Sequence, residues 1–113
     1  MASLLDQLNP DYVSYIKKID EVAEIGPCSV LLFDDETIAE RNATYEIQDD
    51  VPGFASIGNE GANLHFFMRL DRTVEVFMGY LGDKENELVH VSSDVFIWIE
   101  GGCRYPDDWG PEN

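Results

Sequence analysis

Positive charge is scarce in this sequence. Its 113 residues include 7 Lys plus Arg against 23 Asp plus Glu, which gives a formal net charge of -16 at pH 7. Nucleic-acid-binding proteins draw most of their sequence-independent affinity from cationic contacts to phosphate, so this balance argues against direct nucleic-acid binding. An anionic membrane surface is disfavoured for the same reason. The charge instead permits fast capture of a basic protein partner, or serves only to keep the protein in solution.

Cysteine and long hydrophobic runs are scarce as well. Cys28 and Cys103 are the two cysteines, and they lie far apart without a C-x-x-C motif. We expect reduced thiols in a cytoplasmic protein, with a disulfide between them as the alternative. No run approaches the roughly 18 apolar residues of a membrane span, so we expect no membrane association. The start MASLLDQLNPDY has no basic region and no continuous apolar stretch, so we expect no secretory signal.

The sequence has few motifs that indicate catalysis or metal binding. His65 and His90 share no ligand spacing with each other or with a cysteine, so they do not indicate a zinc site. The segment GFASIG (53–58) is one residue too long for the G-x-S-x-G motif of a nucleophile elbow. The acidic loop at 82–87 lacks the length and the central glycine of a calcium loop. We therefore expect no catalytic residues, no metal and no cofactor, with an enzyme or small-ligand binder as the remaining alternative.

Apolar and aromatic residues, at 44% and 12% of the chain, are sufficient for a packed core. Their spacing and the capping and turn residues predict an order of elements. Helices are predicted over 3–8, 9–26, 34–50 and 92–102, and strands over 28–33, 54–58, 63–70, 73–81 and 88–91. This order indicates one α+β domain over 1–113, with helices packed on a mostly antiparallel sheet and a C-terminal helix. The segment 104–113 is predicted to be an extended tail, either packed through its aromatic residues or loose.

The segment PGFASIGNEGANLHFF (52–67) is rich in glycine. A phosphate-binding loop would lead into a helix, usually with a lysine nearby. This segment leads into a strand pattern and contains no lysine, and Glu60 lies between two of its glycines. We therefore predict tight turns between strands, with Pro52, Gly53, Gly58 and Gly61 as the turn residues.

Acidic residues gather in two groups. The first group lies within 34–50, where Arg41 is the only cation, and the second lies within 83–87, where Lys84 is the only cation. They are either two solvated faces or a contact surface for a basic protein. The residues predicted to bind a partner are Asp34, Asp35, Glu36, Glu46, Asp49, Asp50, Asn59 and Glu60.

The run VPGFASIGNEGANLHFFM (51–68) resembles the signature of the SUKH superfamily, the Smi/Knr-like domains. In that family a proline and an aromatic residue lead a short strand, an Ile-Gly pair follows, and a polar turn with glycine leads into the next strand. The matching residues here are Pro52, Phe54, Ile57, Gly58, Asn59, Glu60, Gly61 and Leu64.

Two flanking segments are also similar to that family. LNPDYVSYI is similar to its early helix, and VHVSSDVFIWIEGGC to its last strand, serine cap and aromatic-rich helix. The matching residues are Pro10, Asp11, Tyr12, Ser92, Ser93, Phe96, Trp98 and Ile99. The resemblance covers roughly Asn9 to Cys103.

The resemblance implies an α+β domain without catalysis. Bacterial members are regarded as immunity proteins, which bind and neutralise a toxin that is often a nuclease. Other members are regulatory or scaffolding proteins, and a partner other than a toxin is the alternative. We expect the acidic surface to occlude a basic toxin domain.

Overall fold

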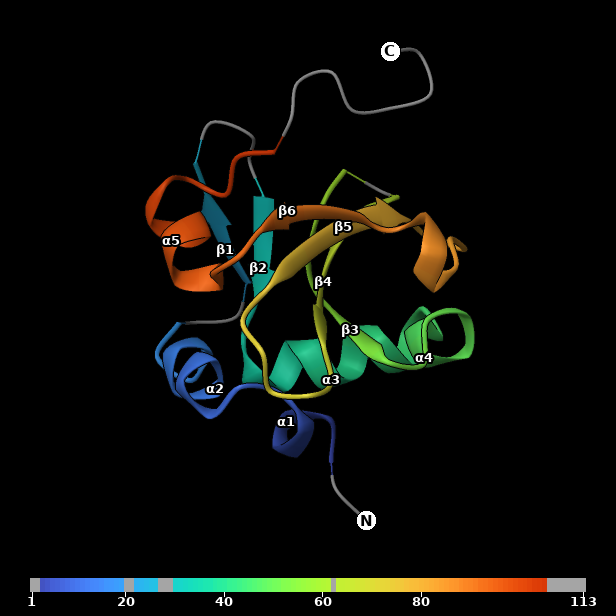
Figure 1. The fold of residues 1–113 in the computed structure, drawn as a ribbon. Coiled ribbons are helices and arrows are strands. Elements are labelled where there is room, and N and C mark those ends of the chain that lie inside the picture. Colours follow the sequence, from blue (N-terminus) through green and yellow to red (C-terminus); the bar gives the residue numbers. More distant parts are fainter. Residues whose placement is uncertain (1–2, 20–21, 27–29, 62, 106–113) are drawn as a thin grey trace.

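The computed structural model describes residues 3–19, 22–26, 30–61 and 63–105 (Figure 1). The helices are α1 (Leu4–Gln7), α2 (Pro10–Ile16), α3 (Asp35–Thr44), α4 (Ile47–Asp50) and α5 (Val95–Glu100), with a 3-10 helix η1 (Glu85–Glu87). The strands are β1 (Val22–Ile25), β2 (Val30–Phe33), β3 (Phe54–Glu60), β4 (Leu64–Arg69), β5 (Val76–Tyr80) and β6 (Val89–Ser92). In the described residues these strands form one six-stranded sheet in sequence order, and each neighbouring pair is antiparallel. The predicted α+β class is confirmed.

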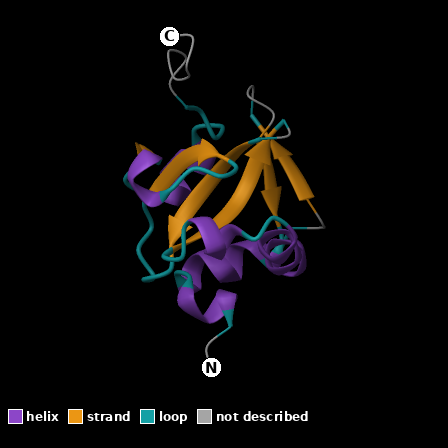
Figure 2. Cartoon of the chain, turned by 90° about the vertical axis from the view of Figure 1, so that its right-hand side faces the viewer, coloured by secondary structure: helices purple, strands orange, loops and turns teal. Residues whose placement is uncertain are grey.

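Both faces of the sheet carry apolar side chains. On β4, Phe66 and Met68 are buried in the main core, whereas Phe67 points to the opposite face. The main core also takes Tyr12 from α2 and Trp98 from α5. Figure 2 shows most of the helices gathered at the end of the molecule that holds the N-terminus.

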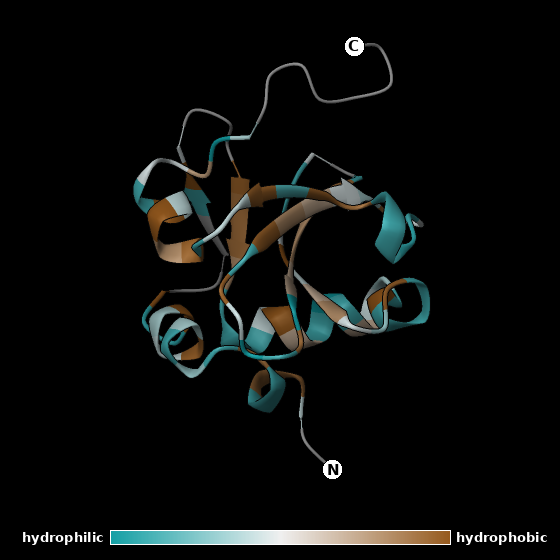
Figure 3. Ribbon diagram, viewed as in Figure 1, coloured by the Kyte–Doolittle hydropathy of each residue, from teal (hydrophilic) through white to brown (hydrophobic). Residues whose placement is uncertain are grey.

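The opposite face holds a smaller cluster of buried residues. It contains Ile47, Val51, Phe54, Phe67 and Phe77. Through this cluster α4 packs on β3, β4 and β5. The polar side of α4 faces outward. In Figure 3 the strands are coloured largely hydrophobic, whereas η1 beside α4 is coloured hydrophilic.

The prediction of one helix over 9–26 is wrong in its second half. Asn9 caps α2 as expected, because its Oδ1 accepts hydrogen bonds from the backbone N–H groups of Asp11 and Tyr12. The helix ends at Ile16, and Val22–Ile25 pairs with β2 as strand β1. In this short segment, backbone hydrogen bonding to a neighbouring strand outweighs the helix-like spacing of the apolar residues. Gly26, at a φ of 73°, follows a strand and not a helix.

The segment 34–50 is mostly helical, as predicted, but it is broken in two. Glu46 lies in the left-handed region, with φ of 53° and ψ of 43°, and separates α3 from α4. The break turns the chain so that Ile47 is buried in the smaller cluster.

The prediction that Gly58 is a turn residue is wrong. It lies inside β3, just after a bulge at Ile57, and pairs with Leu32 on one side and Phe66 on the other. A Cβ at this position would come within 2.4 Å of the backbone oxygen of Leu31, so glycine is needed for close strand approach. The strand therefore runs past the predicted end at 58.

The other predicted turn residues lie in turns. Pro52 and Gly53 form the turn before β3, and Gly61, at a φ of 68°, follows its last residue. The predicted hairpin is also confirmed, with β4 and β5 joined through Asp71 and Arg72.

The C-terminal helix is confirmed with a different cap. Asp94, and not Ser92 or Ser93, accepts hydrogen bonds from the backbone N–H groups at the start of α5. Of the predicted tail, only Arg104 and Tyr105 are described, and the backbone oxygen of Arg104 accepts a hydrogen bond from the Trp98 ring. Cys103 is fully buried. Cys28 lies outside the described residues, as does 106–113.

Candidate functional site

The acids at the C-terminal end of the first group meet the second group on one side of the molecule. Lys84 Nζ lies 3.3 Å from Asp50 Oδ1, and the backbone N–H of Gly53 donates to Glu85 Oε1 at 3.1 Å. These two contacts hold η1 beside α4, as Figure 1 also shows. We call the result the acidic surface. Its residues are Glu46, Asp49, Asp50, Asp83, Glu85 and Glu87.

Several of these carboxylates also organise the local backbone. Asp83 Oδ2 accepts from the N–H of Tyr80 at 2.8 Å, and Glu87 Oε1 accepts from the N–H of Lys84 at 2.8 Å. Glu46 and Asp49 are exposed, with no side-chain contact of this kind. They are therefore the residues of this surface that can be changed with least effect on the fold.

The three acids at the start of α3 do not join the acidic surface. Asp34 is 9% exposed and caps α3, because its Oδ1 accepts from the N–H of Thr37 at 2.7 Å. Asp35 and Glu36 lie in the first turn, where acids complement the helix dipole. The ten residues of α3 place them roughly 15 Å from α4.

Asn59 and Glu60 lie at the far end of β3 from α4. Asn59 is 6% exposed, and its Nδ2 donates to the backbone oxygen of Gly61. Glu60 Oε2 accepts a hydrogen bond from Tyr105 Oη at 3.2 Å. With about 3.3 Å per residue, Asn59 and Glu60 are about 16 and about 20 Å along the strand from Phe54, where α4 packs. The structure thus separates them from the acidic surface.

A buried polar network positions α3 and α4 on the sheet. Asn42 Nδ2 donates to the backbone oxygens of Ser56 and Ile38, at 2.8 and 2.7 Å. Asn42 Oδ1 accepts from the N–H of Ser56 at 2.8 Å and from Gln48 Nε2 at 3.1 Å. Gln48 also donates to the oxygen of Phe54. Asn42 therefore pairs with Ser56 as a neighbouring strand would.

Sequence reasoning missed Asn42 and Gln48. A signal for Asn42 was present, since it follows Ile38 by four residues and so shares the buried face of α3. An amide at a core position of a helix indicates a hydrogen-bonded network, because burial without partners is costly.

Ser56 and His65 form a hydroxyl–imidazole pair. Ser56 Oγ lies 2.7 Å from His65 Nδ1, a contact that in hydrolases activates the serine. Both residues are 0% exposed, so no dissolved substrate can reach the hydroxyl in this conformation. The pair joins β3 to β4 and serves packing. Among the described residues, no group of three potential metal ligands is present.

His65 is held neutral. Burial lowers its pKa from 6.5 to about 4, and the positive charge of Arg41 acts in the same direction. The Tyr45 ring meets the imidazole edge-on at 5.1 Å, and Nε2 has no hydrogen-bond partner among the described residues. A proton on His65 would therefore be a buried charge without an acidic partner in these contacts.

Acid is expected to destabilise the fold through His65. The unfolded chain takes up the proton near pH 6.5 and the folded chain only near pH 4, so stability present above pH 6.5 is lost as the pH falls between these values. The full loss is about 3 kcal/mol in the free energy of unfolding. Urea unfolding at pH 7, 6, 5 and 4 measures it, as the difference in pH slope between the wild type and His65→Gln.

Asn86→Gln is the control for that measurement, because Asn86 is exposed and the change removes no titratable group. Its unfolding free energy should follow the wild-type pH slope. Comparing slopes also removes the common effect of the many carboxylates. Equal slopes for the wild type and His65→Gln would contradict the expected result.

Two comparisons bear on the family. No protein-family model matches the chain, and no curated protein matches it. Membership of the SUKH superfamily therefore stays a prediction from the residues quoted above. No helix among the described residues has the length and apolar character required to cross a bilayer.

Proposed function

We propose that this protein is a cytoplasmic immunity protein that binds a basic toxin domain, such as a nuclease, and neutralises it by occlusion. The observation that carries the proposal is the meeting of acids from the two groups on α4 and η1, where Lys84 is the only cation of 82–87. The SUKH resemblance supports the class of partner. The protein would act by binding alone.

Electrostatics would act mainly on the rate of encounter. Opposite surface charges raise association rates by about 10- to 1,000-fold at low salt, and salt screens the effect. Exposed ion pairs add little affinity by themselves, since each contributes about 0 to 1 kcal/mol. Occlusion would depend on shape at the turn that Pro52 and Gly53 form beside the acidic surface.

Reversing two charges of the acidic surface is expected to slow binding. For Glu46→Lys with Asp49→Lys, we expect the association rate constant for a candidate basic toxin domain to fall at least about tenfold at 50 mM salt. The difference should shrink at 500 mM salt. Stopped-flow mixing measures the rates, and co-expression with the toxin measures protection of the cells.

Glu24→Lys with Glu100→Lys is the matched control, because it changes the net charge equally at exposed sites on β1 and α5. This control should bind and protect like the wild type. If the acidic-surface variant protects cells and associates at the wild-type rate, the proposed contact surface is wrong. Binding to a basic protein without any protection would instead favour a scaffolding role.

A further inference from the structure

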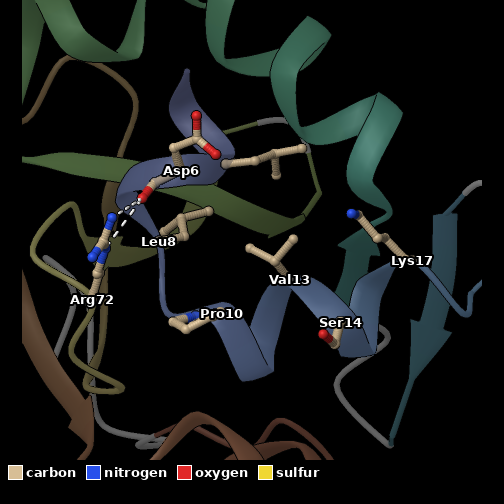
Figure 4. Close-up of a pocket in the computed structure, with 8 residues that line it drawn as sticks. Asp6, Leu8, Pro10, Val13, Ser14, Lys17 and Arg72 are labelled. Atoms are coloured by element: carbon tan, nitrogen blue, oxygen red, sulfur yellow. Dashed lines mark hydrogen bonds between the residues drawn. The ribbon is translucent and has the colours of Figure 1, made fainter. Parts of the chain in front are cut away.

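A groove lies between α1 and α2, away from the acidic surface. It has a volume of about 410 Å³, and Arg72 from the turn between β4 and β5 closes one end (Figure 4). Its lining residues are Leu5, Asp6, Leu8, Pro10, Val13, Ser14, Lys17 and Arg72. From α2 these are positions 10, 13, 14 and 17, which share one face of the helix.

Arg72 is held in place from two sides. Its guanidinium donates to the backbone oxygen of Asp6 through Nε at 3.2 Å and Nη2 at 3.0 Å, and its own backbone oxygen accepts from Asn9 Nδ2 at 3.0 Å. Its φ is 69°, a left-handed conformation that is costly for a residue other than glycine. Because Asp6 contributes a neutral carbonyl, the guanidinium keeps its full charge and several N–H groups for a ligand.

Lys17 supplies a second cation at the other end of the groove. Its side chain is exposed and has no hydrogen bond or ion pair among the described residues. Figure 4 shows Leu8 and Val13 between Lys17 and Arg72, and the carboxylate of Asp6 turned away from the guanidinium. That carboxylate accepts from the N–H of Ser3 at the start of α1.

Two other cations of the protein, unlike Arg72 and Lys17, lie beside carboxylates. Arg41 lies 3.4 Å from a carboxylate oxygen of Glu40, and Lys84 lies 3.3 Å from one of Asp50. In a chain of net charge -16, two cations without a carboxylate partner border one apolar floor. The charge pattern of the groove is therefore positive, apolar, positive.

We propose that this groove binds a short peptide segment of a partner in which apolar side chains lie between two acidic ones. One carboxylate would pair with Arg72 and the other with Lys17, while the apolar side chains cover Leu5 and Val13. The groove runs along α2 from Pro10 to Lys17, which is about 10 Å. An extended peptide covers that length with three to four residues. This surface is separate from the acidic surface and does not depend on its role.

The test uses a labelled tetrapeptide, acetyl-Glu-Leu-Leu-Glu-amide, at 150 mM salt, where charges are screened beyond roughly 8 Å. We expect saturable binding by fluorescence polarisation, with NMR shift changes in the amides of 4–17 and 70–73. The neutral peptide acetyl-Gln-Leu-Leu-Gln-amide should bind at least tenfold more weakly. Lys17→Glu should lower the affinity for the acidic peptide at least fivefold, and Arg72→Gln should lower it further.

Lys18→Glu is the matched control, because it changes the net charge by the same amount as Lys17→Glu. Lys18 is exposed and does not line the groove. It should leave peptide affinity within twofold of the wild type. Equal weakening by Lys17→Glu and Lys18→Glu, or no shifts in the groove at millimolar peptide, would overturn the proposal. So would a dimer in sedimentation that Lys17→Glu dissociates, because the occupant would then be a second copy of this chain.

Discussion

Asn42→Ala is expected to lower the free energy of unfolding by about 3 kcal/mol. Asn42 is 2% exposed and makes four hydrogen bonds, two as donor and two as acceptor. Its removal leaves the N–H and the oxygen of Ser56 without these partners inside the protein, and each unpaired group carries a desolvation cost. Urea unfolding followed by circular dichroism measures the change.

Two further variants sharpen that measurement. Asn42→Asp keeps the shape but loses both donated bonds and buries a charge, so it should destabilise at least as much as Asn42→Ala at pH 7. Asn86→Ala changes the same residue type at an exposed site in η1 and should stay within about 0.5 kcal/mol of the wild type. A loss of under 1 kcal/mol for both Asn42 variants would show that the network does not hold α3 to β3.

The elements with strong local signals could be predicted from the sequence. Asn9 and Pro10 mark the start of α2, and Asp71 and Arg72 mark the turn between β4 and β5, because capping and turn chemistry act over a few residues. The end of α2 could not be predicted in this way. Ile25 fits a helix or a strand locally, and its pairing with Val30 on β2 decides between them.

The acidic surface could be predicted only in part. Clustering in the sequence predicts Glu46, Asp49 and Asp50 as partner-binding residues, and all three lie in it. Their approach to 83–87 depends on a contact between Asp50 and Lys84, which are 34 residues apart, and on the order of strands between them. No local pattern encodes that approach. Asp34 shows the converse, since its acidity suggested binding and its hydrogen bond to Thr37 makes it a helix cap.

Gly58→Ala is expected to cost about 3 kcal/mol or more in the free energy of unfolding. The added Cβ would lie 2.4 Å from the backbone oxygen of Leu31 and 3.3 Å from the Cα of Leu32, so β2 and β3 would have to move apart. The opposing atoms belong to the backbone of a paired strand, and a side-chain rotation cannot relieve the contact. The clash would weaken the pairing of β2 with β3 and therefore the packing of α3 on β3. Thermal and urea unfolding measure the loss.

Gly101→Ala is the matched control for Gly58→Ala. Its added Cβ would meet the backbone oxygen of Ile97 at 3.4 Å, and its φ of -80° suits any residue, so its stability should stay within about 1 kcal/mol of the wild type. If Gly58→Ala is equally mild, β3 relaxes at the bulge beside Ile57 without loss of pairing. Hydrogen exchange across β2 and β3 distinguishes the two cases, because weakened pairing exposes the amides that lie between these two strands, whereas relaxation at the bulge leaves them protected.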